Sequence, residues 1–173
     1  MHPKNRFQYC PECSKATFHY HANEGYFLCD NCGLQFFINA AAAVAAIILD
    51  NDNRILFTQR AKPPAADTLD LPGGFVDINE SAENALKREI MEELNLALST
   101  IEYFTSQPNQ YNYNDLTYFT LDLTYICHAY DFDQIKARDD IKSYEFLRPD
   151  EVDIGRIGLD SIKTIFTRYK NSH

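Results

Sequence analysis

The chain has 173 residues, of which 45% are hydrophobic and 24% charged, and this balance suits one domain of ordinary size with a small appendage. Its formal net charge of −9 argues against a broad basic surface for nucleic acid or an anionic membrane. The longest apolar run, residues 40–49, is about half as long as a bilayer-spanning helix, and the first six residues hold no apolar signal segment, so we expect a cytoplasmic protein without a membrane partner.

Two C-x2-C pairs stand near the start of the chain. Cys10 and Cys13 form the first pair, and Cys29 and Cys32 form the second, with fifteen residues between the pairs. This spacing is typical of two knuckles that present four thiolates to one zinc ion. Two disulfides are the alternative, but each would close a very short loop, and no secretory signal is evident. Because four thiolates fill the coordination sphere of zinc, we predict a structural Zn²⁺ site and not a catalytic one.

The segment between the cysteine pairs is rich in aromatic residues. A turn at Asn23-Glu24-Gly25 divides it, which predicts a short hairpin over residues 17–28. We assign His19 and His21 to the surface of this hairpin and not to the zinc. We therefore expect a zinc ribbon over residues 1–37, with packing as its main role and a linker at residues 35–39.

The apolar run at residues 40–49 opens the second region. It does not alternate, which suits a strand buried on both faces, although its alanines would also suit a helix. The turn sequence at residues 50–53 favours the strand and predicts a hairpin with residues 54–60. Residues 62–66 then read as a loop, and residues 68–71 as a short strand that leads into a double glycine.

An acidic helix follows the double glycine. Glu89, Glu92 and Glu93 are spaced i, i+3 and i+4, so they share one arc of about 100° on a helix. An apolar stripe lies directly beside that arc: Ala82, Leu86, Ile90 and Leu94. Acidic runs are usually solvated faces, but carboxylates at the edge of a core need a positive partner. A divalent cation would serve, and so would Arg88.

From Gly74 the residues fit the pattern G-x5-E-x7-R-E-U-x-E-E-x-G-U, where U is aliphatic. The matching positions are Gly74, Glu80, Arg88-Glu89-Ile90, Glu92-Glu93 and Leu96. This motif resembles the Nudix box, with Asn95 in place of its glycine. Asparagine tolerates the left-handed conformation that a helix C-terminus requires, so we expect the backbone to be kept. We take residues 38–173 as a Nudix hydrolase domain.

The resemblance implies an α/β/α sandwich with a mixed sheet, preceded here by the zinc ribbon, and hydrolysis of a nucleoside diphosphate linked to another moiety. By position, Glu89, Glu92 and Glu93 would hold Mg²⁺ or Mn²⁺, with the Gly74 carbonyl as a further ligand. Arg88 would orient the glutamates through ion pairs. Hard oxygen ligands suit these cations, which agrees with the expectation from the residues alone.

A loop after a strand at residues 101–104 is expected to contact the substrate. A zinc ribbon followed by a Nudix box resembles the NADH pyrophosphatase family, but of its S-Q-P-W-P-F-P-x-S marker only Ser106-Gln107-Pro108 is present. The substrate is therefore open among ADP-ribose, NADH and similar dinucleotides or nucleotide sugars. Tyr111 and Tyr113 could stack on a base, with ordinary packing as the alternative. Gln107 and Arg60 complete the predicted substrate site.

The remainder of the chain closes the domain. Residues 115–128 predict a long strand in which Cys127 is a buried thiol, and residues 159–169 predict an amphipathic helix. The polar segment between them could add a metal ligand or a base. Asp140 is our first choice, with Asp139 and Glu145 as rivals.

We thus expect a metal-dependent Nudix pyrophosphohydrolase that acts on a small nucleotide. The presence of all three glutamates and Arg88 favours an enzyme over a non-catalytic nucleotide sensor whose ribbon contacts a partner. A zinc-ribbon adaptor for nucleic acid is disfavoured by the acidic balance. The oligomeric state stays open, with a homodimer as one alternative.

Overall fold

The computed structural model describes residues 1–172, which cluster into two compact units. The first unit contains residues 1–40 and 110–119, and the remaining described residues form the second. From the sequence we expect residues 110–119 in the second domain, whereas in the structure they cluster with residues 1–40. Within residues 1–172, no helix combines the length and the apolar character needed to cross a bilayer.

The first unit is a small antiparallel sheet with a short 3-10 helix, η1 (Pro3–Asn5), before it. The predicted hairpin is present as β1 (Phe18–His21) and β2 (Tyr26–Cys29). A third strand, β3 (Gln35–Phe37), pairs with β2 where we expected only a linker, because a run of three residues shows no readable periodicity. Phe18 stacks on Phe27 with ring centroids 4.8 Å apart, and this pair fills the core of the sheet.

A seven-stranded mixed sheet forms the centre of the second unit, in the order β10-β5-β4-β9-β8, with β6 beside β5 and β7 beside β4. Its strands are β4 (Ala41–Leu49), β5 (Ile55–Arg60), β6 (Leu69–Asp70), β7 (Gly73–Phe75), β8 (Leu98–Tyr113), β9 (Leu116–Ala129) and β10 (Ile141–Leu147). β4 runs parallel to β9 and antiparallel to β5 and β7. The strands predicted before the acidic helix and at residues 115–128 are all present.

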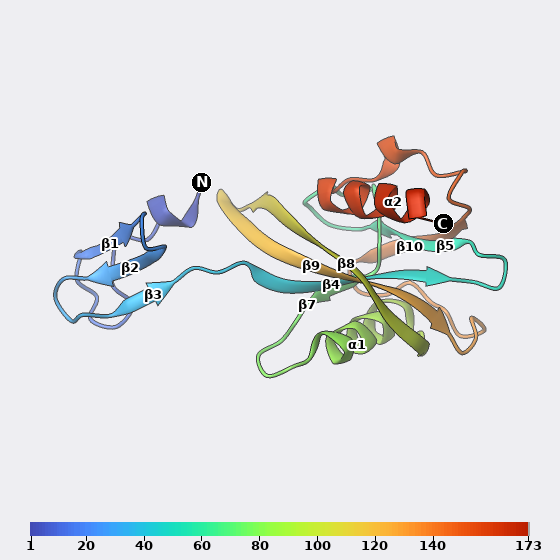
Figure 1. Ribbon diagram of the computed structural model, residues 1–173, viewed down its shortest axis with the longest axis horizontal. Helices are drawn as coiled ribbons and strands as arrows, with labels where there is room; N and C mark the ends of the chain where they lie inside the picture. Colours follow the sequence, from blue (N-terminus) through green and yellow to red (C-terminus); the bar gives the residue numbers. More distant parts are fainter. Residues whose placement is uncertain (173) are drawn as a thin grey trace. The chain divides into compact units, whose positions relative to one another are not determined.

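Two helices, α1 (Ala82–Leu94) and α2 (Asp160–Ser172), cover opposite faces of this sheet (Figure 1). A 3-10 turn, η2 (Ile154–Arg156), precedes α2. Alternate residues of β4 point to the two helices: Val44, Ala46 and Ile48 pack with α1, and Ala45, Ile47 and Leu49 pack with α2. β4 is therefore buried on both faces, as its unbroken apolar run predicted. The sandwich is the α/β/α architecture that the resemblance implied.

The segment after Phe104 is a strand and not the loop that we expected. β8 extends to Tyr113 beside β9, and the turn between the two strands is Asn114-Asp115, both with positive φ (47° and 63°). Asn and Asp tolerate the left-handed conformation that such a two-residue turn requires. The polar residues of β8 have low strand propensity, so pairing with β9 decides their conformation.

Candidate active site and metal centre

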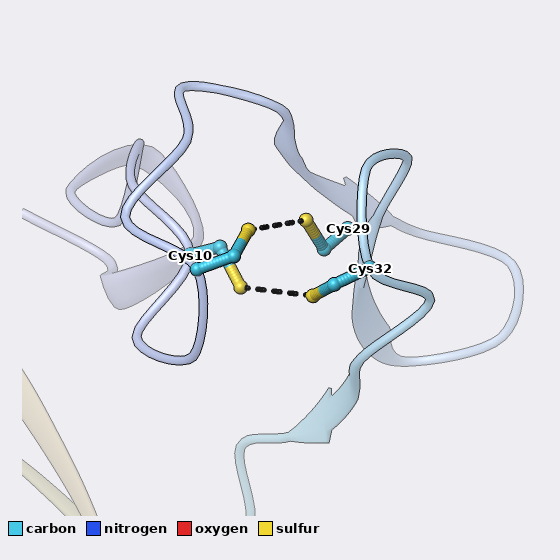
Figure 2. Close-up of side chains that lie close together, drawn as sticks. Cys10, Cys29 and Cys32 are labelled. Atoms are coloured by element: carbon cyan, nitrogen blue, oxygen red, sulfur yellow. Dashed lines mark hydrogen bonds between the residues drawn. The ribbon is translucent and has the colours of Figure 1, made fainter.

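The four cysteines of the first unit converge on one point. Cys10 Sγ lies 3.6 Å from Cys32 Sγ, and Cys13 Sγ lies 3.6 Å from Cys29 Sγ (Figure 2). Four sulfurs at about 2.3 Å from a zinc ion would form a tetrahedron with edges of about 3.8 Å, so the cluster has the size that zinc requires. A disulfide would need about 2.05 Å between sulfurs, and all four cysteines are free. A hydrogen bond with Thr17 lowers the pKa of Cys29 to about 6, which favours the thiolate that binds metal.

The acidic helix α1 begins and ends at the residues that its sequence indicates. Ser81 is the N-cap, and its hydroxyl accepts a hydrogen bond from the Asn84 N–H (3.3 Å). Asn95 is the C-cap, with φ 53° and ψ 42°, and its N–H donates to the Met91 carbonyl (3.0 Å). The left-handed conformation expected at Asn95 is confirmed. These caps fix both ends of the helix.

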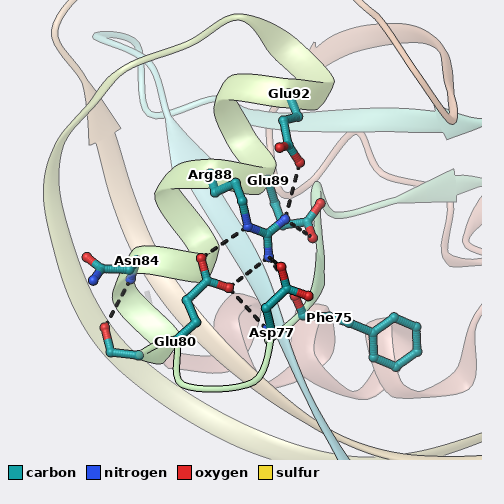
Figure 3. Close-up of polar contacts among 8 residues, drawn as sticks. Phe75, Asp77, Glu80, Asn84, Arg88, Glu89 and Glu92 are labelled. Atoms are coloured by element: carbon teal, nitrogen blue, oxygen red, sulfur yellow. Dashed lines mark hydrogen bonds and ion pairs between the residues drawn. The ribbon is translucent and has the colours of Figure 1, made fainter.

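Arg88 is the centre of a network at the start of the acidic arc (Figure 3). Its Nε and Nη2 donate to the two oxygens of Glu80 (3.0 and 2.8 Å) in a bidentate pair. Its Nη1 donates to Glu89 Oε1 (2.8 Å) and Glu92 Oε2 (3.2 Å). Its Nη2 also donates to the Phe75 carbonyl (3.0 Å). One guanidinium therefore ties two of the predicted metal ligands to the loop that precedes the helix.

Glu93 is the buried member of the triplet, with only 8% of its surface exposed. Its Oε2 accepts a hydrogen bond from the Gly73 N–H (3.0 Å). Burial raises the pKa of Glu93 to about 8, and the charges of Glu89, Asp70 and Asp139 act in the same direction. Burial also raises the pKa of Glu89, against its contact with Arg88. Glu89 and Glu93 are therefore partly desolvated and lie close to other negative charges, and this environment favours the binding of a cation.

The double glycine lets the backbone lie directly against the carboxylates. A Cβ on Gly74 would come within 2.4 Å of the Glu89 Cδ, and a Cβ on Gly73 within 2.1 Å of the Val44 carbonyl oxygen. Gly73 also has φ 149°, which residues with a side chain rarely adopt. A larger residue at position 74 would collide with the Glu89 side chain, and one at position 73 would collide with the backbone of β4. β7 thus forms the wall that faces Glu89 and Glu93.

The glutamates do not converge as the cysteines do. Within residues 1–172, the four cysteines are the only group of His, Cys, Asp or Glu side chains placed closely enough to share one metal ion. Glu89 and Glu92 turn toward Arg88 instead, and Glu93 turns toward Gly73. The three predicted ligands therefore come from one helix, and each of them accepts a hydrogen bond from Arg88 or from Gly73.

Two other predicted site residues are engaged in ion pairs. The Arg60 Nη1 lies 2.5 Å from Asp70 Oδ2, and its Nε donates to the Pro64 carbonyl (2.7 Å). Asp140 pairs with Lys62, and its side chain is half-exposed. Its neighbour Asp139, at φ 50°, is one of three residues whose charges act on Glu93.

The tyrosines predicted to stack on a base lie in the first unit. Tyr111 stacks on Tyr118 with centroids 5.7 Å apart, and Tyr113 meets the same ring edge-on at 6.5 Å. They cluster with the ribbon and not with α1. Gln107 is in β8 within the second unit and is partly buried. Base stacking by Tyr111 and Tyr113 stays a prediction.

Asp70 also belongs to the region around Glu93, although the sequence did not lead us to expect it there. Asp70 is 7% exposed, and burial raises its pKa, against the nearby Arg60 charge. One signal was available: Asp70 is the single polar residue between Leu69 and Leu71, both buried. A carboxylate in such a place needs a specific partner.

This chain matches one protein family and several individual proteins. The NUDIX domain family matches residues 39–167, which is more than half of the chain. An ADP-ribose pyrophosphatase from Methanocaldococcus jannaschii is 31% identical over 141 residues, covering 79% of this chain and 79% of that protein. A NAD-capped RNA hydrolase NudC from Photorhabdus laumondii subsp. laumondii is 30% identical over 101 residues, which is 58% of this chain and 38% of that protein. The chain thus spans well under half of this second relative.

Solved structures share the fold. A NUDIX hydrolase from Nitrosomonas europaea superposes with a TM-score of 0.76 over 96% of this chain and 92% of its own, at 20% identity. A MutT NUDIX hydrolase from Burkholderia pseudomallei gives a TM-score of 0.66 over 75% of this chain and 98% of its own, at 23% identity. These similarities confirm the mixed-sheet sandwich.

Proposed function

Since this chain belongs to the NUDIX family, we propose that it hydrolyses ADP-ribose or a closely similar nucleoside diphosphate derivative, with Mg²⁺ or Mn²⁺ held by Glu89, Glu92 and Glu93. Hydrolysis of a pyrophosphate bond in a nucleotide derivative is the chemistry that the family and its ADP-ribose pyrophosphatase relative support. The choice of ADP-ribose over NADH rests on that relative, which matches most of this chain, and on the incomplete NADH pyrophosphatase marker.

One observation carries this proposal: the buried Glu93 accepts a hydrogen bond from the Gly73 N–H, and the backbone of the next residue, Gly74, lies directly against the Glu89 carboxylate. Carboxylate oxygens are the ligands that Mg²⁺ and Mn²⁺ prefer. A buried carboxylate with a raised pKa, and a second one beside it, need positive charge. The donor set therefore fits a hard divalent cation.

The protein's own groups can then be assigned roles in pyrophosphate hydrolysis. A bound Mg²⁺ or Mn²⁺ would supply positive charge to the pyrophosphate oxygens and make an attacking water more acidic. Gly73 N–H keeps Glu93 in place, and Arg88 keeps Glu89 and Glu92 on the same side of the helix. Such a reaction depends on positioning and charge more than on covalent chemistry.

A further acidic group is proposed at Asp139. Asp140 was our first choice from the sequence, but its carboxylate pairs with Lys62, and Glu145 pairs with Arg156. Asp139 is exposed, and its charge acts on Glu93. The neighbouring Arg138 N–H donates to the Glu93 carbonyl (2.8 Å), which holds this turn against the end of α1. These contacts favour Asp139 as the extra ligand or proton acceptor.

The Cys10, Cys13, Cys29 and Cys32 cluster is proposed to hold a structural Zn²⁺. Four thiolates leave no open position on zinc for water or substrate. Phe18, Phe27 and the buried Cys10 and Cys29 form a core too small to hold the sheet together without help. The ion would therefore stabilise the first unit and take no part in the reaction.

The test is to incubate the full chain with ADP-ribose, NADH and a nucleotide sugar, each with Mg²⁺ or Mn²⁺, and to separate the products by chromatography. We expect AMP and ribose 5-phosphate from ADP-ribose. Glu92→Gln should lower the turnover on the order of a hundredfold while the fold is kept. Glu83→Gln is the matched control, because Glu83 is an exposed carboxylate of the same helix.

Two outcomes would overturn this proposal. Equal turnover of the wild type and Glu92→Gln would mean that the acidic arc does not perform the reaction. Inactivity toward every substrate, together with tight nucleotide binding, would favour the non-catalytic nucleotide sensor.

A further inference from the structure

Arg60 is held on two sides by the protein. Its Nε donates to the Pro64 carbonyl (2.7 Å), and its Nη1 donates to Asp70 Oδ2 (2.5 Å). The side chains of Arg60 and Asp70 are 26% and 10% exposed, so most of the pair is removed from water. A guanidinium engaged in this way has little freedom to rearrange around a phosphate. Binding of substrate by Arg60, which the sequence suggested, stays a prediction.

Asp70 uses both of its carboxylate oxygens. Oδ2 meets Arg60, and Oδ1 accepts a hydrogen bond from the Leu71 N–H (2.9 Å). The Thr58 hydroxyl donates to the Asp70 carbonyl (3.3 Å), in register with the pairing of β5 and β6. Asp70 is thus attached to β5 by the ion pair with Arg60 and by the hydrogen bond from Thr58. Its other carboxylate oxygen accepts from the N–H of the next residue, Leu71.

Residues 70–73 lead directly to the carboxylate site. The Pro72 carbonyl accepts a hydrogen bond from the Ala46 N–H (2.9 Å), and the next N–H, of Gly73, donates to Glu93 (3.0 Å). The charge of Asp70 is one of those that act on Glu93, which places the two carboxylates near each other. Any movement of residues 70–73 would therefore move the group that orients Glu93.

We propose that Arg60 and Asp70 are a positioning pair, which fixes residues 70–73 so that the Gly73 N–H holds Glu93 in place for the divalent cation. The proposal rests on the proposed function, since it assigns a role within the same metal site. Arg60 also neutralises a buried carboxylate that would otherwise repel Glu93. Breaking such a pair leaves an unpaired buried charge, which is more disruptive than removing both partners.

The proposal predicts a metal-binding defect in the absence of substrate. Arg60→Met and Asp70→Asn should each weaken Mn²⁺ binding by about 10- to 100-fold, the usual effect of removing a group that orients a metal ligand. Binding is measured by the electron paramagnetic resonance signal of free Mn²⁺ during titration of the full chain. The double variant should be no worse than the worse single variant, because the residues act as one unit. At saturating Mn²⁺ the KM for ADP-ribose should change little.

The matched control is the Arg54–Asp50 pair, which stands at the opposite end of β5. Arg54 Nε donates to Asp50 Oδ2 (2.7 Å), and the Arg54 N–H donates to Asp50 Oδ1 (2.9 Å), so this pair closes the turn between β4 and β5. Arg54→Met should leave Mn²⁺ binding unchanged. If Arg60→Met fails to fold, as judged by circular dichroism, Asp70→Asn decides the question, because an amide keeps the size and the Leu71 hydrogen bond of the carboxylate.

Three results separate the possible failures. If Arg60→Met raises KM and leaves Mn²⁺ binding intact, Arg60 is a substrate ligand and the positioning pair is wrong. In a second result, wild type binds Mn²⁺, Glu93→Gln does not, and both Arg60→Met and Asp70→Asn bind it as wild type does. In that case too, only the proposal of a positioning pair is wrong. If Glu93→Gln binds Mn²⁺ as wild type does, the proposed function itself is wrong.

Discussion

The two candidate metal sites of this chain are built in opposite ways. In the first unit, four cysteines from two knuckles point at one another, with sulfurs 3.6 Å apart across the cluster. In the second unit, three glutamates come from consecutive turns of one helix; Arg88 donates to Glu89 and Glu92, and the Gly73 N–H donates to Glu93. Beyond the cluster itself, the Thr17 hydroxyl lies 3.4 Å from Cys29 Sγ.

This difference agrees with the proposal that the cysteines support the fold and that the glutamates perform the reaction. Ligands from two knuckles cross-link the chain when the ion binds, and four thiolates close the coordination sphere. Ligands from one helix cross-link nothing, so the ion adds little to the fold and can exchange with substrate and solvent. Arg88 and Gly73 keep those ligands in place while the ion is absent. The predictions below test this contrast, beginning with the largest expected effect.

Removal of the zinc should unfold the first unit and leave the second folded. Zinc binding to small domains contributes on the order of 10 kcal/mol to folding, which is more than the small aromatic core of the first unit can replace. Cys29→Ser should therefore abolish the hydrogen-exchange protection of β1–β3, while the protection of β4 and α1 is kept. Turnover should persist.

The control for this experiment is Cys127→Ala, which alters a buried cysteine outside the cluster. It should lower the stability of the second unit and leave the zinc bound. Loss of turnover in Cys29→Ser with an intact second unit would contradict a purely structural zinc.

Replacing Arg88 should disorganise the acidic arc. Arg88→Met leaves Glu80, Glu89 and Glu92 without their shared partner, so we expect turnover to fall by about 10- to 100-fold. Arg88→Lys should recover only part of this loss, because an ammonium group cannot form the bidentate pair. The measurement is kcat at saturating Mn²⁺, with Lys87→Met, an exposed neighbour, as the control. Equal kcat in the Arg88 and Lys87 variants would contradict this role.

The burial of Glu93 should make the metal-free protein less stable at high pH. The pKa of Glu93 rises from an ordinary 4.5 to about 8 in the folded chain, so between these values the folded state binds more protons than the unfolded state. The free energy of unfolding contributed by this group must then fall as the pH rises through that window. Urea titrations from pH 5 to pH 8 should show this slope in the wild type and a flatter one in Glu93→Gln. An identical slope in the two proteins would assign the titration to other groups.

The smallest expected effect concerns the turn after β9. Asp139→Asn should lower turnover by about tenfold, since it removes a carboxylate that acts on Glu93. Asp140→Asn serves as the neighbouring control and should change turnover little, because Asp140 pairs with Lys62. The reverse order of effects would restore Asp140 as the extra ligand or base.

The sequence predicted the parts of the fold whose signals are local. The helix end at Asn95, the i+4 apolar stripe and the three glutamates all lie within one continuous stretch, so the helix and its acidic face could be predicted directly from the sequence. β4 could be predicted for the same reason, because its apolar run is continuous in the sequence. β3 and the outer part of β8 were not, because their conformation depends on pairing with β2 and β9.

The site contacts that the sequence did not predict share one physical cause: each depends on a partner that is distant in the sequence. Arg60 looked free to bind a phosphate, and only the pairing of β5 with β6 shows that Asp70 holds it. Asp139 and Asp140 are adjacent, yet the charge of Asp139 acts on Glu93 and Asp140 pairs with Lys62. Such directions follow from tertiary structure and leave no local pattern.

The metal content of the purified chain is the most direct test of two sites with two roles. The wild type and a Glu92→Gln/Glu93→Gln variant are dialysed against a mild chelator, then against Mn²⁺, and analysed by inductively coupled plasma mass spectrometry. We expect retained zinc at one ion per chain in both proteins, and exchangeable manganese in the wild type alone. Absence of zinc from the folded wild type, or equal manganese in both proteins, would contradict the assignment of the cysteines to folding and of the glutamates to catalysis.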